Sequence, residues 1–187
     1  SVYGEPSIIP TSEEYTPLTP ISFYGASKLA AEALISSYSH SFGINAVIFR
    51  LANIIGPKLT HGVIYDLINK LNNNPNELEI LGDGNQTKSY MHVEDCVEAM
   101  AIASENSKTK LEILNVGSQD TITVKEIADI LCSSMKLDPK LKFTGSKRGW
   151  KGDVTTMQLE ISKISKLGWE PKYNSREAVI RTVESLV

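Results

Sequence analysis

Apolar residues along this chain fall into two patterns, helical spacing and continuous runs. Helical spacing, with apolar positions three and four residues apart, predicts helices over 22–42, 63–71, 93–101, 123–135, 162–168 and 175–186. Short apolar runs predict strands over 45–51, 77–81, 87–92, 111–116 and 141–144. The first of these runs is continuous at 46–49, which is typical of a strand buried on both faces. Together the elements predict a mixed α/β fold.

The residues between these elements predict where each begins and ends. The stretch 5–20 holds four prolines and no apolar period, so we expect a loop, and 53–62 should be another. Gly43 suits a left-handed helix cap. Thr123 and Glu126 fit a capping box, and Ser175 should cap the last helix. The stretch 82–85 (Gly-Asp-Gly-Asn) predicts a tight hairpin turn.

Composition and charge exclude several classes of protein. A length of 187 residues suits one domain or one and a half. The net charge is −3, and acidic and basic residues are mixed, so we expect no nucleic-acid partner. No apolar run has the length of a membrane span. Cys96 and Cys132 lie on apolar helix stripes, which favours buried thiols in a reducing cytoplasm. The three histidines lack metal-ligand spacing, so we expect no metal.

Tyr24 and Lys28 form the first candidate for chemistry. They are four residues apart, which places both side chains on one face of a helix, one turn apart. A phenol is a poor base at neutral pH, and a nearby cation favours its phenolate form. Such a pair can move a proton to and from a substrate hydroxyl. Most chance matches to this spacing are solvated helix surface, so the spacing needs support from its surroundings.

Three stretches around this pair carry a family resemblance. The stretch 1–4 (Ser-Val-Tyr-Gly) precedes it, 17–20 (Pro-Leu-Thr-Pro) leads into the helix, and 50–57 (Arg-Leu-Ala-Asn-Ile-Ile-Gly-Pro) follows. In this order and spacing they resemble the extended short-chain dehydrogenase/reductase family, in particular its nucleotide-sugar epimerases and dehydratases. The resemblance covers essentially the whole chain and begins about midway along the family's usual length.

The resemblance implies an architecture for the chain. Residues 1–57 would be the C-terminal remnant of a Rossmann-type dinucleotide-binding domain. Residues 58–187 would form mainly a small mixed α/β substrate-binding region, with strand 111–116 returning to the main sheet. We therefore expect the C-terminal part of a longer protein, in which the glycine-rich pyrophosphate loop precedes Ser1. We expect this chain alone to be inactive.

The resemblance also assigns roles to residues of the first region. Tyr24 would be the catalytic acid and base, and Lys28 would hold the cofactor ribose and favour the phenolate. The backbone of Ala52 would touch the nicotinamide of NAD. Asn53 would donate its amide to the substrate diphosphate, although an Asn before Gly-Pro is also an ordinary turn former.

Roles in the second region rest on two motifs. The block 82–95 resembles the family's G-D-G-x-Q-x-R-x-[FY]-x-H-V-x-D pattern, in which Lys88 replaces an Arg that contacts phosphate. Residues 148–153 (Arg-Gly-Trp-Lys-Gly-Asp) resemble its R-x-G-D loop, in which Arg grips the diphosphate and Asp the ribose. Asp153 fits that Asp, but Trp150 stands in place of the Arg, so Arg148 or Lys151 must reach the diphosphate.

Met157, four residues after Asp153, would line the pocket near the sugar 2-substituent, or else belong to ordinary core packing. His92 and Asp95 are better explained as strand-to-helix caps than as catalysts.

The resemblance implies NAD-dependent 4-epimerisation of UDP-glucose or UDP-galactose by the full-length protein, in the cytoplasm. A homodimer through the helix that carries Tyr24 and Lys28 is one expected assembly. A dehydratase or reductase of the same family is an alternative, although dehydratases carry Glu where this chain has Ser1. A non-catalytic substrate-binding fragment is the alternative from another class. The sequence leaves open the sugar, the base and the choice between NAD and NADP.

Overall fold

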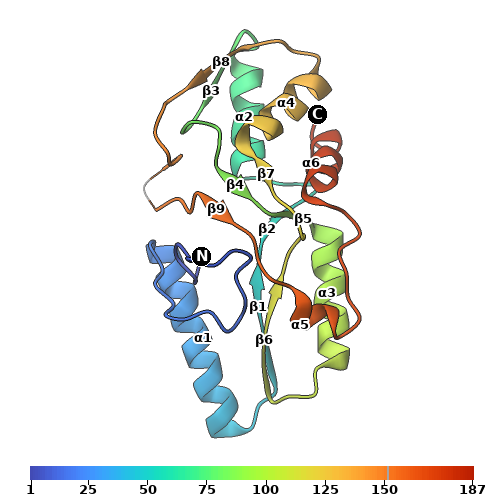
Figure 1. Cartoon of the computed structure of the whole chain (residues 1–187). Helices are drawn as coiled ribbons and strands as arrows, with labels where there is room; N and C mark the ends of the chain where they lie inside the picture. Colours follow the sequence, from blue (N-terminus) through green and yellow to red (C-terminus); the bar gives the residue numbers. More distant parts are fainter. Residues whose placement is uncertain (151) are drawn as a thin grey trace.

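The centre of the fold is a pair of parallel strands. The computed structural model describes residues 1–150 and 152–187. Strand β1 (Ala46–Leu51) pairs in parallel with β6 (Leu111–Val116), in register from Ala46↔Leu111 to Leu51↔Val116. Helix α1 (Phe23–Phe42) lies to one side of this pair, and α3 (Val93–Asn106) and α5 (Ser162–Ser165) lie to the other (Figure 1).

Strand β1 is less buried than its continuous apolar run predicts. Only Ile48 and Arg50 are buried in it, and Val47 and Phe49 are half-buried. Within the described part of the chain, β6 is the one strand that pairs with β1, so the other edge of β1 has no strand beside it there. The apolar run therefore identified a strand correctly but overstated its burial in this chain.

Short strand pairs connect the centre to the upper half of the molecule in Figure 1. The pairs are β2 (Asn53–Ile55) with β5 (Tyr90–His92), β3 (Glu77–Ile80) with β8 (Lys140–Phe143), and β4 (Thr87–Lys88) between β7 (Ile122–Thr123) and β9 (Thr156–Met157). All are parallel except β4 with β7. The parallel pairings agree with the predicted α/β class.

Three local predictions are wrong at these strands. Residues 53–55 form strand β2 rather than loop. The predicted strand 87–92 divides at Ser89, whose N–H donates to the Met157 carbonyl (2.9 Å) while its own carbonyl accepts from the Asn53 N–H (3.2 Å). The turn at 82–85 is no hairpin, because β3 pairs with β8 and β4 pairs with β7 and β9. Each of these features depends on a partner that is distant in sequence.

The helix ends follow their local signals with two exceptions. Gly43 ends α1 with φ of 68°, and the capping box of Thr123 opens α4 (Val124–Met135) as predicted. Helix α6 (Ser175–Glu184) is instead capped by Asn174, which exchanges hydrogen bonds with Glu177, so the prediction for Ser175 is wrong. Ser162, predicted as a cap, is the first residue of α5.

Two hydrophobic clusters fill the two halves of the molecule. One gathers α2 (Val63–Asn73), α4, α6 and β3 in the upper half of Figure 1. The other joins β6 and α3 to the C-terminal Trp169, which is 1% exposed. Both clusters draw on residues beyond position 57, and the division of the chain at 57/58 stays a prediction. No helix of the described residues is both long enough and apolar enough to cross a membrane.

Candidate active site

Tyr24 and Lys28 lie in the first turns of α1, which begins after the Ser22 cap. The Ser22 hydroxyl accepts the Gly25 N–H at 3.0 Å, which fixes where the helix starts. The Lys28 Nζ lies 5.3 Å from the centre of the Tyr24 ring. Tyr24 is 63% exposed, and Lys28 is exposed as well. The one-turn juxtaposition that the spacing predicted is therefore present, on an open face where both groups can meet a ligand.

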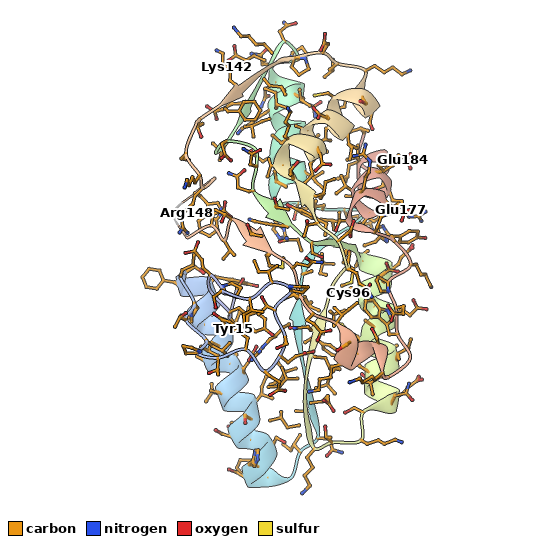
Figure 2. The ribbon with its side chains drawn as sticks, viewed as in Figure 1. Tyr15, Cys96, Lys142, Arg148, Glu177 and Glu184 are labelled. Carbon is orange, nitrogen blue, oxygen red and sulfur yellow. The ribbon has the colours of Figure 1, made fainter. Side chains whose placement is uncertain are left out.

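The loop 145–153 packs against the start of this helix. Gly152 has φ of 91°, and a Cβ added there would lie 3.3 Å from the Ile21 carbonyl oxygen and 3.2 Å from the Trp150 ring. Glycine therefore suits this position both for its φ and for its close approach to the residue before the α1 cap. Figure 2 shows Arg148 on this loop, above the end of α1 that carries Tyr24. The fold thus brings Gly152 of the predicted diphosphate loop to the start of the helix that carries the predicted proton-transfer pair.

Asp153 and Lys88 form an ion pair between this loop and β4. The Lys88 Nζ lies 2.5 Å from Asp153 Oδ1, and the Gly149 N–H donates to Asp153 Oδ2 at 3.0 Å. The Asp153 side chain is 5% exposed and that of Lys88 is 21% exposed. Lys88 and Asp153, to which the resemblance assigned contacts with the phosphate and the ribose, therefore bind each other. Burial, and then the charge of Asp153, raise the pKa of the neighbouring Tyr90.

Arg148 reaches across to the N-terminal loop. Its Nη1 donates to the Asp153 carbonyl at 2.9 Å, and its Nη2 donates to the Glu5 carboxylate at 2.9 Å. Glu5 could not be identified as a partner from the sequence, because it lies 143 positions away in a loop without a motif. Lys151, the other candidate for gripping the diphosphate, lies outside the described residues.

Ala52 and Asn53 lie where β1 ends and β2 begins. Ala52 is buried, and its N–H donates to the Val116 carbonyl at 2.8 Å. The Asn53 amide donates to the Ser89 carbonyl at 3.1 Å, directly beside Lys88 in sequence. Because a side-chain amide carries two N–H donors, Asn53 can keep this bond and donate a second to a ligand.

Met157 is paired in register with Lys88 across β4 and β9, and it packs against the second hydrophobic cluster. It therefore lies close to the candidate phosphate cation, and its contact with a sugar stays a prediction.

His92 and Asp95 serve structure. His92 caps α3 and accepts the Glu94 N–H at 3.4 Å, as predicted. Asp95 instead accepts the backbone N–H groups of Lys172 and Tyr173, both at 3.2 Å, and so ties α3 to the C-terminal segment. Burial raises the pKa of the Asp95 carboxyl, and these two hydrogen bonds oppose the shift.

The exposed groups fit part of a dinucleotide cofactor. The Tyr24 hydroxyl and the Lys28 ammonium can donate to ribose hydroxyls, and a Cβ added at Gly117 would lie 2.9 Å from the Ala52 Cβ, which shows how closely the backbone approaches there. The described residues hold no cluster of three or more side chains that could bind a metal ion.

Comparisons with known proteins show the family and the fold of this chain. A model of the NAD dependent epimerase/dehydratase family matches residues 1–117. A putative UDP-glucose 4-epimerase of Methanocaldococcus jannaschii is 34% identical over 187 residues, covering 98% of this chain and 59% of that protein. A solved UDP-galactose 4-epimerase is 43% identical with a TM-score of 0.90, covering 99% of this chain and 60% of that one.

The UDP-glucose 4-epimerase of Thermotoga maritima, solved with UDP-glucose, is 30% identical with a TM-score of 0.85, covering 98% of this chain and 59% of that one. The chain thus has the α/β fold of these epimerases and spans about 60% of their length.

Proposed function

The chain belongs to the NAD dependent epimerase/dehydratase family, and from that premise we propose that the whole protein interconverts UDP-glucose and UDP-galactose by epimerisation at C4. The observation that carries the proposal is the position of Tyr24 and Lys28, one turn apart and exposed, at the helix end on which the loop 145–153 packs. The identity of 43% to a UDP-galactose 4-epimerase supports the choice within the family.

In this proposal Tyr24 moves the proton. Its phenolate oxygen takes the proton from the sugar 4-hydroxyl and later returns it, while Lys28 favours the phenolate. When bound, NAD would supply the hydride acceptor and donor for C4 of the sugar. Lys28 and the Tyr24 hydroxyl would hold the cofactor ribose, and the backbone of Ala52 would contact the nicotinamide.

The diphosphate would lie among Asn53, Lys88 and Arg148. Asn53 can donate its second amide hydrogen, and the Lys88 ammonium has three donors, so it can keep Asp153 and hold a phosphate oxygen as well. Asp153 is positioned by Lys88 and Gly149 to accept from a ribose hydroxyl. Met157 would face the sugar.

The same residues suit a dehydratase or a reductase of the family, and the name of the family model carries dehydratase beside epimerase. Ser1 directly precedes Val2, at the position where the dehydratases have an acidic residue, which favours epimerisation. For the assembly we propose a homodimer through α1, on which Leu34, Tyr38 and Phe42 are exposed.

The test is turnover of UDP-galactose by the whole protein, with and without Tyr24→Phe. The substitution removes one oxygen from an exposed side chain, so we expect the fold to persist and kcat to fall by about 10²–10⁴-fold. Tyr65→Phe is the control, because Tyr65 is also exposed, at 39%, and lies on α2 rather than on the helix of the proposed dimer. Near wild-type turnover by Tyr24→Phe would refute the proposed role. The 187-residue chain alone should show no turnover, and a keto-deoxy product would instead identify a dehydratase.

A further inference from the structure

Arg50 occupies an unusual place for a charged residue. It lies in β1, three residues before Asn53, and only 8% of its surface is exposed. Its guanidinium holds the Glu32 carboxylate through three contacts, Nη2 to Oε2 at 2.7 Å, Nε to Oε1 at 3.0 Å and Nε to Oε2 at 3.3 Å. This two-pronged geometry is specific to arginine. Because Glu32 lies on α1, the pair fastens that helix to the strand that leads to Asn53.

The opposite side of the guanidinium is also held. Nη1 donates to the Tyr3 hydroxyl at 3.0 Å and to the Glu13 carbonyl at 3.3 Å, and the guanidinium carbon lies 4.8 Å from the centre of the Tyr3 ring. The Tyr3 hydroxyl in turn donates to Asn115 Oδ1 at 2.7 Å. Burial acts to lower the pKa of Arg50, but the hydrogen bonds with Glu32 and Tyr3 outweigh it and raise the pKa. The cation is therefore permanent and fixed in place.

The spacing of side chains on α1 links the Arg50–Glu32 pair to Lys28 and Tyr24. Tyr24, Lys28 and Glu32 follow one another at intervals of four residues, so all three side chains project from one face. The Lys28 ammonium therefore has a possible partner one turn away in either direction. It lies by the Tyr24 ring, and among residues 1–150 and 152–187 no ion pair joins it to Glu32. The Glu32 carboxylate is occupied by Arg50 instead.

We propose that Arg50 is a positioning residue that withholds the Glu32 carboxylate from Lys28, so that the Lys28 ammonium is directed to Tyr24. Without Arg50, Glu32 would be a buried carboxylate without its cation, and Lys28 would be the nearest cation on its own helix. Lys28 would then turn away from Tyr24, and the phenolate would lose its counter-charge. The consequence for catalysis rests on the proposed function, whereas the contact itself does not.

Other charged groups near this network are few in the described part of the chain. Tyr3 and Glu13 face Arg50 from the N-terminal loop, and the Glu13 carboxylate accepts the Asn115 N–H at 2.7 Å. None of these groups changes in the variants below, so differences among the variants report on Arg50 and Glu32.

The experiment compares crystal structures of the whole protein and its variants, and the turnover of UDP-galactose by each. In Arg50→Met the Lys28 Nζ should leave the Tyr24 ring and lie within about 4 Å of the Glu32 carboxylate, and kcat should fall by about tenfold or more. Glu32→Met breaks the same ion pair but leaves Lys28 with Tyr24, so the position of Lys28 and kcat should stay as in the unmodified protein. In the double variant both charges are gone, and the position of Lys28 and kcat should return to those of the unmodified protein.

A merely structural ion pair predicts a different result. Arg50→Met and Glu32→Met would then lower kcat alike, and equal losses, or a Lys28 that stays beside Tyr24 in Arg50→Met, would overturn the inference. Loss of one buried partner can prevent folding, and Arg50→Lys, which keeps the charge with fewer contacts, then replaces Arg50→Met and should lower kcat by less. If the proposed function alone fails, the unmodified protein shows no epimerisation while Lys28 still moves to Glu32 in Arg50→Met.

Discussion

Replacing Lys88 by Met tests how the Lys88–Asp153 pair holds the loop 145–153. The substitution keeps the length of the side chain and removes its charge, so Asp153 loses the ammonium at 2.5 Å and keeps the Gly149 N–H as a donor. At an effective dielectric constant of about 20, the lost attraction is about 7 kcal/mol before solvation is counted. Most of this is offset, because pairing has already removed both charges from water.

The net cost follows from burial. Removing one partner of a fully buried pair costs about 3–5 kcal/mol. Because the Lys88 side chain retains 21% exposure, while that of Asp153 retains 5%, we expect about 2 kcal/mol for Lys88→Met. Lys142 and Glu77 form a pair of similar length, 2.6 Å, but with 53% and 38% exposure. Lys142→Met should therefore cost less than about 1 kcal/mol.

The assay is urea unfolding of the unmodified chain, the two single Lys variants, Asp153→Asn and the Lys88→Met/Asp153→Asn double variant. The coupling between Lys88 and Asp153 should exceed about 1 kcal/mol, since the two groups touch. In the whole protein, Lys88→Met should also raise KM for UDP-galactose more than it lowers kcat, because the phosphate is bound in substrate and transition state alike. Equal stability losses for Lys88→Met and Lys142→Met would refute the reasoning from burial.

Two further substitutions test the pocket and the core. Met157→Ala should raise the ratio of kcat/KM for UDP-N-acetylglucosamine over UDP-glucose by about tenfold, because a hydrophobic wall discriminates by only about 1–3 kcal/mol; an unchanged ratio would place Met157 outside the sugar pocket. Asp95 has a pKa above its ordinary value of 3.8, so the native state holds more protons than the unfolded chain above that pH. The free energy of unfolding should therefore fall as pH rises from about 4 through the raised pKa. Its profile against pH should be flatter for Asp95→Asn than for the unmodified chain, whereas the exposed control Asp129→Asn should leave the profile unchanged.

The elements that the sequence predicted correctly are those whose signals are local. Helix α1 begins after Ser22 and ends at Gly43 because a hydroxyl cap and a left-handed glycine act within a few residues. The capping box of Thr123 is local in the same way. The cap of α6 was also within reach of the sequence, because Asn174 and Glu177 have capping-box spacing and Ser175 merely stands beside them.

The errors arise where one segment depends on a distant one. The predicted strand 87–92 divides at Ser89 because the two backbone groups of Ser89 bind different segments. Its N–H donates to Met157, and its carbonyl accepts from Asn53. The alternation of apolar and polar residues over these six positions carries no information about such a change of partner strand. In the candidate site, the sequence placed Tyr24 and Lys28 on one face of a helix, because that geometry is set by spacing alone. It left Arg148 and Lys151 as equal alternatives, because the reach of a loop side chain depends on partners such as Glu5.

Three cations in and behind the candidate site are each already paired with a carboxylate. Lys88 is held by Asp153, Arg148 by Glu5, and Arg50 by Glu32. Each of the first two pairs has one member on the loop that meets α1. The Arg148 pair has 42% and 44% exposure, so a ligand phosphate can compete with Glu5 for Arg148. The side chains of Arg50 and Glu32 are only 7% and 13% exposed, which closes them to such competition. The exposed Arg148 pair therefore suits the proposed binding of a diphosphate, whereas the Arg50 pair suits the fixed orientation that the proposed proton transfer by Tyr24 requires.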